Sequence, residues 1–342
     1  MKLKSKKLTF ISIILMVLGL ILFTIAFIAT QGKIGAYLDT SGIHYSYAEG
    51  SGNQSDAYDL PDFKGIDVTY AGADVTLCAS DHYGISYENG TNNKSPKVEV
   101  VNDILLITQP SNAFSINLFT FNFKSTKIVV YYPKDSDFSK VDLSVTSGNV
   151  SISEINADKF DLSVVDGYLE LTDIEAETIT LSPWSTTVYL NNIKADKLTY
   201  SNTDGKSVFN HMQIMEEFKI DVGSGKVELN DVTAEYLNMK AIDIAIKGTD
   251  LVTNGLEGSG FSSTFDLAGD FNGNSNLSNV DGRTNLSLSG SYTDYNYNLK
   301  TLDGSISMNG EKQSGSVKEN NNSENSINID QTSGKIQIEF AK

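Results

Sequence analysis

The chain has 342 residues, of which 43 are acidic and 26 are basic, so its net charge at pH 7 is −17. This balance disfavours nucleic-acid binding, because binding to a phosphate backbone depends on Lys and Arg displacing counterions. A single cysteine, Cys78, excludes an intrachain disulfide, three histidines leave few ligands for a zinc site, and five prolines amid abundant Gly, Asn, Ser and Thr favour strands and tight turns over long helices.

Residues 8–30 form an uncharged, apolar run, and the residues before it, 1–7, contain a cluster of lysines. A helix of this length would span roughly 34 Å, compared with about 30 Å for the hydrocarbon core of a bilayer. We therefore expect a single transmembrane helix over 8–30, with a cytoplasmic N-terminus and an extracytoplasmic C-terminal domain at the cell membrane. A cleaved signal peptide is the alternative, but its apolar region would be shorter and would end in a small-x-small site that is absent here. Residues 31–60 are rich in Gly, Ser, Tyr and Asp and are expected to form an extracytoplasmic tether.

The strongest signal in the remaining residues, 61–342, is a repeat of about 19 residues. Successive units are offset by 19, 19, 19, 20 and 19 residues, with the extra residue near Met215. Each unit holds an alternating apolar strand, a turn with glycine in most units, and a second strand. The units begin at equivalent apolar positions: Val141, Phe160, Ile179, Leu198, Phe218 and Leu237.

This pattern predicts an all-β fold, a single-stranded, stacked parallel β-solenoid that is regular over residues 141–256. No single unit could bury its apolar face alone, so each coil must pack on the next. An antiparallel sandwich of hairpins is the alternative, but hairpins do not require every column to repeat at one fixed spacing. The polar residues 311–325 are expected to form a loop.

A polar column accompanies the repeat. Stacked carboxylates at coil spacing could bind Ca²⁺, or could act as an acid/base pair on a polysaccharide. The alternative is a solvated turn rich in Asp and Asn, which is favoured because Asn192 and His211 interrupt the carboxylates. Glu154, Asp173 and Asp231 are therefore only weak metal-ligand candidates, and we predict neither a metal nor a cofactor. The full column is Glu154, Asp173, Asn192, His211 and Asp231.

The chain has no Gly-x-Ser-x-Gly elbow and its histidines are scattered, so we assign no catalytic residue and predict that the protein is not an enzyme. Aromatic rings offer large contact area with little rotamer entropy to lose. Trp184, Tyr292, Tyr295 and Tyr297 are expected to be exposed and are therefore the predicted binding residues, although alternating tyrosines are also ordinary strand residues.

Five segments carry a family resemblance: residues 63–68 (FKGIDV), 73–77 (ADVTL), 127–133 (KIVVYYP), 147–150 (SGNV) and 332–338 (TSGKIQI). They resemble the bacterial putative-adhesin β-strand-repeat family, a domain of unknown function on membrane-anchored proteins, many of them Gram-positive. The resemblance covers roughly residues 60–340. It implies a β-solenoid outside the membrane and, in some relatives, a link to envelope-stress signalling, but it brings no catalytic residues.

These observations favour a membrane-anchored, extracytoplasmic, non-enzymatic binding or scaffold module of the cell envelope. Its expected partner is an envelope polymer or envelope protein, with membrane contact through residues 8–30 and no nucleic acid. One alternative is an accessory component of an envelope-stress signalling system. Another is a β-helix carbohydrate-active enzyme that uses Asp173, Asp231 or Glu154.

Overall fold

The computed structural model describes residues 2–29, 34–39, 42–47, 54–90, 95–110, 116–120 and 125–340. Its N-terminal element is the helix α1 (Lys2–Ala29), whose described side chains, 12–25 and Ile28, are exposed. Among the described residues, no helix combines the length and the apolar character that crossing a membrane requires. The anchor predicted over residues 8–30 stays a prediction.

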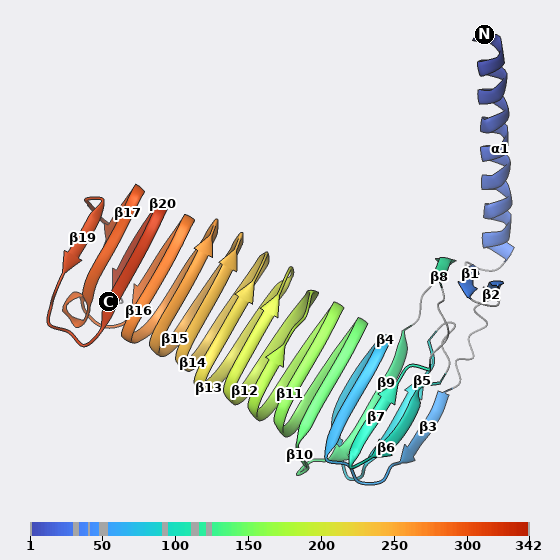
Figure 1. The fold of residues 1–342 in the computed structure, drawn as a ribbon, viewed down its shortest axis with the longest axis horizontal. Coiled ribbons are helices and arrows are strands. Elements are labelled where there is room, and N and C mark those ends of the chain that lie inside the picture. Colours follow the sequence, from blue (N-terminus) through green and yellow to red (C-terminus); the bar gives the residue numbers. More distant parts are fainter. Residues whose placement is uncertain are drawn as a thin grey trace.

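The remaining elements are strands, and most of them form one long stack (Figure 1). Its members that pair in parallel are β4 (Gly65–Ser80), β7 (Ile104–Thr108), β9 (Thr126–Pro133), β10 (Asp137–Phe138), β11 (Lys140–Leu181), β12 (Ser185–Asn202), β13 (Lys206–Val222), β14 (Gly225–Ile242), β15 (Ile244–Phe261), β16 (Ser263–Leu288), β17 (Asn296–Met308) and β20 (Ser326–Phe340). Five strands of the stack pair antiparallel: β3 (Gln54–Asp59), β5 (Gly84–Glu88), β6 (Lys97–Val101), β18 (Glu311–Gln313) and β19 (Ser316–Glu319). A separate antiparallel sheet contains β1 (Ile34–Asp39), β2 (Gly42–Tyr47) and β8 (Ile116–Thr120).

The predicted 19-residue register is confirmed. Ile179 pairs with Leu198, Leu198 with Phe218, and Phe218 with Leu237, so equivalent residues of successive coils lie one above another. The stack continues beyond residue 256, because Leu256 pairs in parallel with Ser275. The fold is therefore all-β, with long stacked strands in an open sheet, as a solenoid requires.

The core runs along the axis of this stack. Within one coil, three short runs of inward-facing residues alternate with exposed ones, as in 141–145, 150–152 and 155–157. A third apolar column follows the second strand and is buried in five successive coils, with side chains no more than 2% exposed: Ile155, Ile174, Ile193, Met212 and Val232. The extra residue expected near Met215 is a bulge, since the β12–β13 and β13–β14 registers shift there and Met215 is 59% exposed.

At both ends of the stack the spatial order differs from the chain order. At the C-terminal end, β20 pairs in parallel with β16 on one side and with β17 on the other, although it follows both in sequence (Figure 1). At the N-terminal end, β4 lies between β11 and the pair β7 and β9. Short antiparallel strands then cover the outer coils, with β18 and β19 on β17, β5 on β9, and β6 on β7.

Two segments that the sequence analysis treated as irregular contain strands. β18 and β19 lie within residues 311–325, where a loop is predicted, because the outer edge of β17 offers unpaired backbone groups for them to bond. Within the predicted tether, residues 31–60, the structure describes β1, β2 and β3, and β3 pairs with β5. Parts of that segment lie outside the described residues.

Candidate functional site

The predicted polar column lies at one corner of each coil. All five residues of the column have a positive φ between 53° and 56°: Glu154, Asp173, Asn192, His211 and Asp231. This left-handed conformation costs an ordinary residue energy, and Asn and Asp adopt it more readily than most other residue types. The local fold therefore explains why Asn and Asp predominate in the column, in agreement with the solvated-turn alternative.

Each candidate carboxylate of this column also has a partner. Lys134 Nζ lies 2.7 Å from Glu154 Oε2, the side-chain amide of Asn192 donates to Asp173, and His211 Nδ1 lies 2.7 Å from Asp231 Oδ2. The hydrogen bond to Glu154 raises the pKa of Lys134. In the described part of the chain, no group of three or more His, Cys, Asp or Glu side chains could hold a metal ion.

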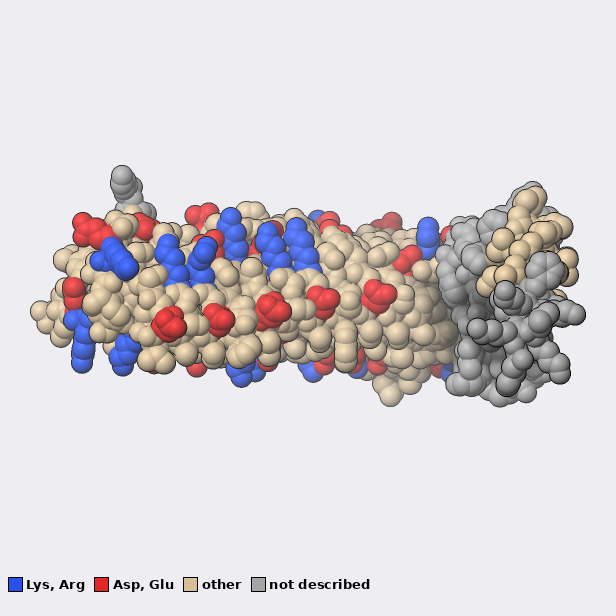
Figure 2. Space-filling model, turned by 90° about the horizontal axis from the view of Figure 1, so that it is seen from above, with Lys and Arg blue, Asp and Glu red and all other residues tan. Residues whose placement is uncertain are grey.

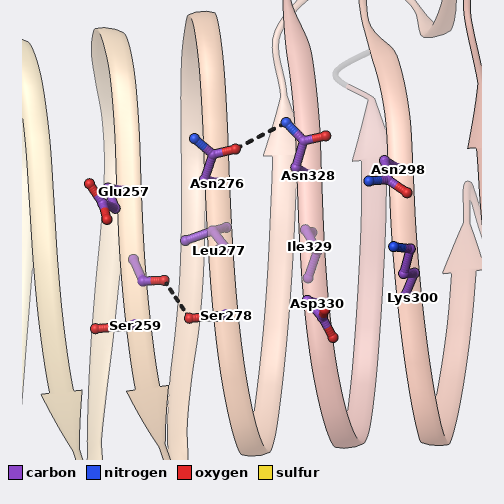
Figure 3. Close-up of a pocket in the computed structure, with 11 residues that line it drawn as sticks. Glu257, Ser259, Asn276, Leu277, Ser278, Asn298, Lys300, Asn328, Ile329 and Asp330 are labelled. Atoms are coloured by element: carbon purple, nitrogen blue, oxygen red, sulfur yellow. Dashed lines mark hydrogen bonds between the residues drawn. The ribbon is translucent and has the colours of Figure 1, made fainter.

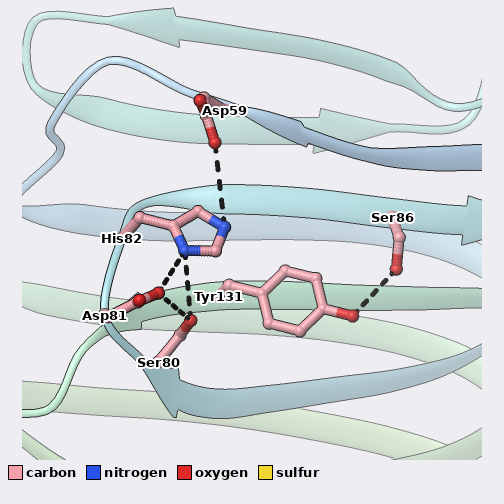
Figure 4. Close-up of polar contacts among 6 residues, drawn as sticks. All are labelled: Asp59, Ser80, Asp81, His82, Ser86 and Tyr131. Atoms are coloured by element: carbon pink, nitrogen blue, oxygen red, sulfur yellow. Dashed lines mark hydrogen bonds and ion pairs between the residues drawn. The ribbon is translucent and has the colours of Figure 1, made fainter.

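A cluster around His82 combines Ser, His and Asp on adjacent residues (Figure 4). His82 Nδ1 lies 2.5 Å from Asp81 Oδ1, and Ser80 Oγ lies 3.4 Å from the same nitrogen. The other ring nitrogen, Nε2, faces Asp59 at 3.7 Å. A catalytic triad needs its serine and its carboxylate on opposite ring nitrogens, so that the imidazole takes the proton of the serine while the carboxylate orients it. Here Ser80 and Asp81 share one nitrogen, and Asp59 lies beyond hydrogen-bond distance of the other at 3.7 Å, so the cluster does not have the geometry of a triad.

The three predicted tyrosines lie together at the C-terminal end of the stack. Tyr295 and Tyr297 are only 3% and 2% exposed, so the prediction that their rings are exposed is wrong. Tyr297 stacks on Tyr292 with ring centroids 5.0 Å apart, and its hydroxyl donates to the carbonyl oxygen of Tyr292 at 2.9 Å. Strand alternation turns Tyr295 and Tyr297 inward, where they fill the last coils of the core.

Tyr292 is half-buried against this core. Its hydroxyl donates to the carboxylate of Glu319, which belongs to the capping strand β19. The pKa of Tyr292 is raised to about 12, mainly because the hydroxyl loses contact with solvent and, second, because of this hydrogen bond. The tyrosine cluster therefore attaches β19 to the end of the stack.

A shallow groove of about 240 Å³ lies on a flat face near the same end (Figure 3). It crosses β15, β16, β20 and β17, and its walls are short polar side chains over the buried residues Leu277 and Ile329. Asn328 Nδ2 donates to Asn276 Oδ1 at 3.0 Å, one coil away. Such amide ladders stabilise stacked strands, and this bond contributes to the structure of the groove whether or not anything binds there.

Trp184, the fourth predicted binding residue, is 62% exposed and lies at a different corner of the coil. The equivalent positions of neighbouring coils also carry exposed apolar side chains, from 40% exposed at Val165 to 87% at Leu302. Ile242 pairs directly with Phe261 in the next coil. For other members, the residues that follow them in the chain pair between coils: Asp166 with Ser185, Asp281 with Ser333, and Ser333 with Asp303. We call this column the Trp184 ridge: Val165, Trp184, Ile242, Phe261, Val280 and Leu302.

The corner explains why these residues are exposed but does not explain why they are apolar. The residue before most of them is buried, as Val164 is before Val165 and Ala241 before Ile242, so strand alternation turns the next one outward. In other coils the same position holds a threonine, namely Thr146, Thr203 or Thr332, and in one coil it holds Gly223. Since Thr and Gly serve the turn as well, the apolar side chains are not required by the fold.

Beside the ridge, the next residue of each coil alternates strictly between Ser and Asp. The hydroxyl of Ser224 donates to Asp204 Oδ1 at 2.9 Å, and that of Ser333 donates to Asp281 Oδ1 at 3.0 Å. Because Ser and Asp alternate, the carboxylates lie two coils apart, at about 9.6 Å. Carboxylates in adjacent coils would lie only about 4.8 Å apart and would repel each other more strongly. We call this column the Asp/Ser ladder: Ser147, Asp166, Ser185, Asp204, Ser224, Asp243, Ser262, Asp281, Ser333 and Asp303.

Lysines lie close to the ladder but, among the described residues, do not form ion pairs with its carboxylates. Figure 2 shows an evenly spaced row of acidic residues along the rod, with basic residues in a row beside it. Lys206 and Lys226 occupy equivalent positions of adjacent coils next to the ladder. Their ammonium groups lie near the carboxylate of Glu228 instead, with Nζ–Oε distances of 3.9 Å for Lys206 and 2.5 Å for Lys226. Among the described residues, no Lys or Arg forms an ion pair with a ladder aspartate.

Trp184 was identified from the sequence as a single residue, but the ridge and the ladder were not recognised as columns along the stack. The signal was present, because the turn pairs recur as Asp-Gly or Ser-Gly and the residue before them recurs as apolar or Thr, as in Val165-Asp166-Gly167 and Leu302-Asp303-Gly304. Coils whose turn has no glycine at this position, such as the one with Trp184, hide the pattern.

Fold and surface together define an all-β solenoid that exposes apolar side chains at the same corner of several coils. The chain belongs to the Toastrack DUF4097 family, whose model matches residues 63–339. Among proteins with curated descriptions, none matches this chain.

Solved structures of proteins titled putative adhesins are similar in part. That from Parabacteroides merdae has 13% identity and a TM-score of 0.46, covering 86% of this chain and 98% of its own. That from Parabacteroides distasonis has 12% identity and a TM-score of 0.40, covering 85% and 98%. That from Bacteroides fragilis has 14% identity and a TM-score of 0.33, covering 84% and 98%. Likeness at this level does not transfer a function.

Proposed function

We propose that this protein is a membrane-anchored, extracytoplasmic binding scaffold of the bacterial cell envelope and that it is not an enzyme. The observation that carries the proposal is the Trp184 ridge, an exposed apolar column along a rigid stack of coils. Exposed apolar patches of this kind on a folded protein mark interaction sites. The stack supplies rigidity, because each coil is hydrogen-bonded to both neighbours.

The proposed anchor is supported by the uncharged run over residues 8–30 and by the exposed apolar side chains of α1, among them Leu15, Leu20 and Ile28. An apolar helix surface without protein contacts favours a lipid environment. The lysines of residues 1–7 favour a cytoplasmic N-terminus, which places the solenoid outside the cell.

A non-enzymatic role is supported by the geometry of the two clusters that hold titratable groups. The column of Glu154, Asp173 and Asp231 is explained by the left-handed corner, and each of these carboxylates has a partner. Ser80 and Asp81 share one nitrogen of His82. Neither cluster supports the alternative of a carbohydrate-active enzyme.

The second candidate, an accessory role in envelope-stress signalling, is favoured by the mixture of aliphatic and aromatic side chains in the ridge. Such a mixture suits a protein partner, because core interface contacts are largely apolar and aromatic.

Two measurements test the proposal. Full-length protein carrying a C-terminal epitope tag is expressed in bacteria, and external protease is added to intact spheroplasts; we expect loss of the tag, with a cytoplasmic protein protected as a control. Purified protein is then incubated with cell-wall polysaccharide, and we expect no release of reducing ends. A protected tag contradicts the location, and steady release that is abolished in Asp173→Ala contradicts the non-enzymatic role.

A further inference from the structure

We propose that the Trp184 ridge docks a basic, amphipathic protein segment, with apolar side chains on the ridge and Lys or Arg side chains on the Asp/Ser ladder. The inference rests on the proposed binding function and names the chemistry of the partner. It is carried by the juxtaposition of the two columns: the Asp/Ser ladder is unbroken along the rod, and the ridge is apolar in most coils and interrupted by Thr203, Gly223 and Thr332.

Charge selects among the possible occupants. The ladder presents Asp166, Asp204, Asp243, Asp281 and Asp303 beside the apolar residues, and no cation of the described chain pairs with them. A second copy of the chain would bring its own ladder and a further net charge of −17 to the contact. Like charges across an interface cost energy, whereas a basic partner gains complementarity and a faster association rate.

A membrane surface and a glycan fit this edge less well. Carboxylates directly beside the apolar column would face anionic lipid headgroups, which attract Lys and Arg. Most ridge residues are aliphatic, and its two aromatic members, Trp184 and Phe261, are separated by coils that carry Thr203, Gly223 and Ile242. A protein segment with Leu, Ile or Val side chains matches such a surface better than a sugar ring does.

The size of the surface indicates the shape of the partner. With coils about 4.8 Å apart, the column from Val165 to Leu302 runs roughly 38 Å. A straight α-helix of about 25 residues has this length. An amphipathic helix presents an apolar stripe with charged residues on its flanks, which is the arrangement that the ridge and ladder require.

The chain provides its own reporter, because Trp184 is its only tryptophan and lies in the ridge. The experiment uses the full-length protein in nanodiscs of zwitterionic lipid and titrates a synthetic 25-residue helical peptide with a leucine stripe flanked by lysines. We expect the emission of Trp184 to shift to the blue as the peptide covers it. The apparent affinity should fall as salt rises, since the ladder contacts are exposed ion pairs.

Three variants connect the signal to the surface. The double variant Ile242→Thr, Phe261→Thr puts at these positions the residue that other coils already carry there, so it should fold, and we expect it to weaken binding about tenfold or more. Asp204→Asn with Asp243→Asn should weaken binding and flatten its salt dependence. Met215→Thr is the matched control, because Met215 is 59% exposed but lies in the bulge outside the ridge, and it should bind like the unmodified protein.

Other results would overturn the inference. These are no spectral shift with the lysine peptide, equal binding of a peptide with glutamates in place of the lysines, or equal affinity of the double variant and the Met215→Thr control. Sedimentation that shows self-association through Phe261 would assign the ridge to a second copy instead, and a shift with anionic vesicles alone would assign it to lipid. An extracytoplasmic, inactive protein with any of these results keeps the proposed function and loses only the ridge partner.

Discussion

Gly167 lies directly over Gly148, and a Cβ atom built on Gly167 would come within 1.9 Å of the carbonyl oxygen of Gly148. Both residues have a φ of 142°, a conformation that residues with a side chain rarely adopt. The glycine corner is therefore held by two constraints at once, the local backbone angle and the contact with the next coil.

We expect Gly167→Ala to lower the free energy of unfolding by more than about 3 kcal/mol, because the new methyl group collides with backbone that cannot move without displacing a neighbouring coil. Urea denaturation followed by circular dichroism measures the change. Gly72→Ala is the matched control, since a Cβ there meets no atom within 4 Å and should change stability little. Equal effects of the two substitutions would contradict the close contact.

The left-handed corner predicts a graded response at Asp173. Asp173→Val should cost about 1–2 kcal/mol, because a β-branched residue is strained at positive φ, while Asp173→Asn should stay within about 0.5 kcal/mol. Thermal melting with and without Ca²⁺ gives both results, and we expect Ca²⁺ to leave the melting temperature unchanged. A rise in melting temperature with Ca²⁺ that Asp173→Asn removes would reinstate the metal hypothesis.

The burial of the tyrosines predicts opposite outcomes for residues that the sequence analysis grouped together. Tyr297→Ala should cost about 3–5 kcal/mol, because it opens a cavity under Tyr292 and Phe340. Trp184→Ala should change stability by no more than about 0.5 kcal/mol, since the ring is exposed. Chemical denaturation of both variants compares them directly, and a larger loss for Trp184→Ala would contradict the assignment of core and surface.

The His82 cluster predicts a pH response. The hydrogen bond that His82 donates to the carboxylate of Asp81 raises the pKa of His82 above its ordinary value of 6.5. Because the folded-state pKa is raised, the stabilisation from protonated His82 is fully present below about pH 6.5 and is lost as the pH rises through the folded-state pKa. The effect on stability should be small because the pair is exposed. NMR titration of the imidazole measures the pKa, and Asp81→Asn should lower it; an unchanged pKa in that variant would show that Asp81 is not the cause.

The repeat, the inward-facing columns and the bulge at Met215 follow from the sequence because they depend on a period that a single chain displays. Ile179, Leu198 and Phe218 are apolar at one spacing, and only stacking in register buries all of them. The positions of β20 and β4 could not be predicted in this way, since any coil with the same pattern can pair with any other. Local periodicity does not specify which two coils are neighbours.

Strand alternation also decided which of the predicted binding residues are exposed. Tyr295 and Tyr297 were assigned to the surface from their residue type, but strand alternation relative to Leu299 turns them inward. Trp184 was identified as a single exposed ring. The ridge required a comparison of the residue before every turn, including those turns that lack glycine. The alternation of the ladder continues past Asp281 to Asp303 only because β20 lies between β16 and β17 and brings Ser333 between them.

That placement has a consequence for how the molecule is made. A chain emerging from the ribosome can wind β11 to β16 in order, each level closing on the one before. The level between β16 and β17 must stay vacant until residues 326–340 have been synthesised, so the distal end is completed by a late insertion rather than by continued winding. Premature termination would thus leave a gap inside the rod, exposing two hydrogen-bonding edges to other nascent chains.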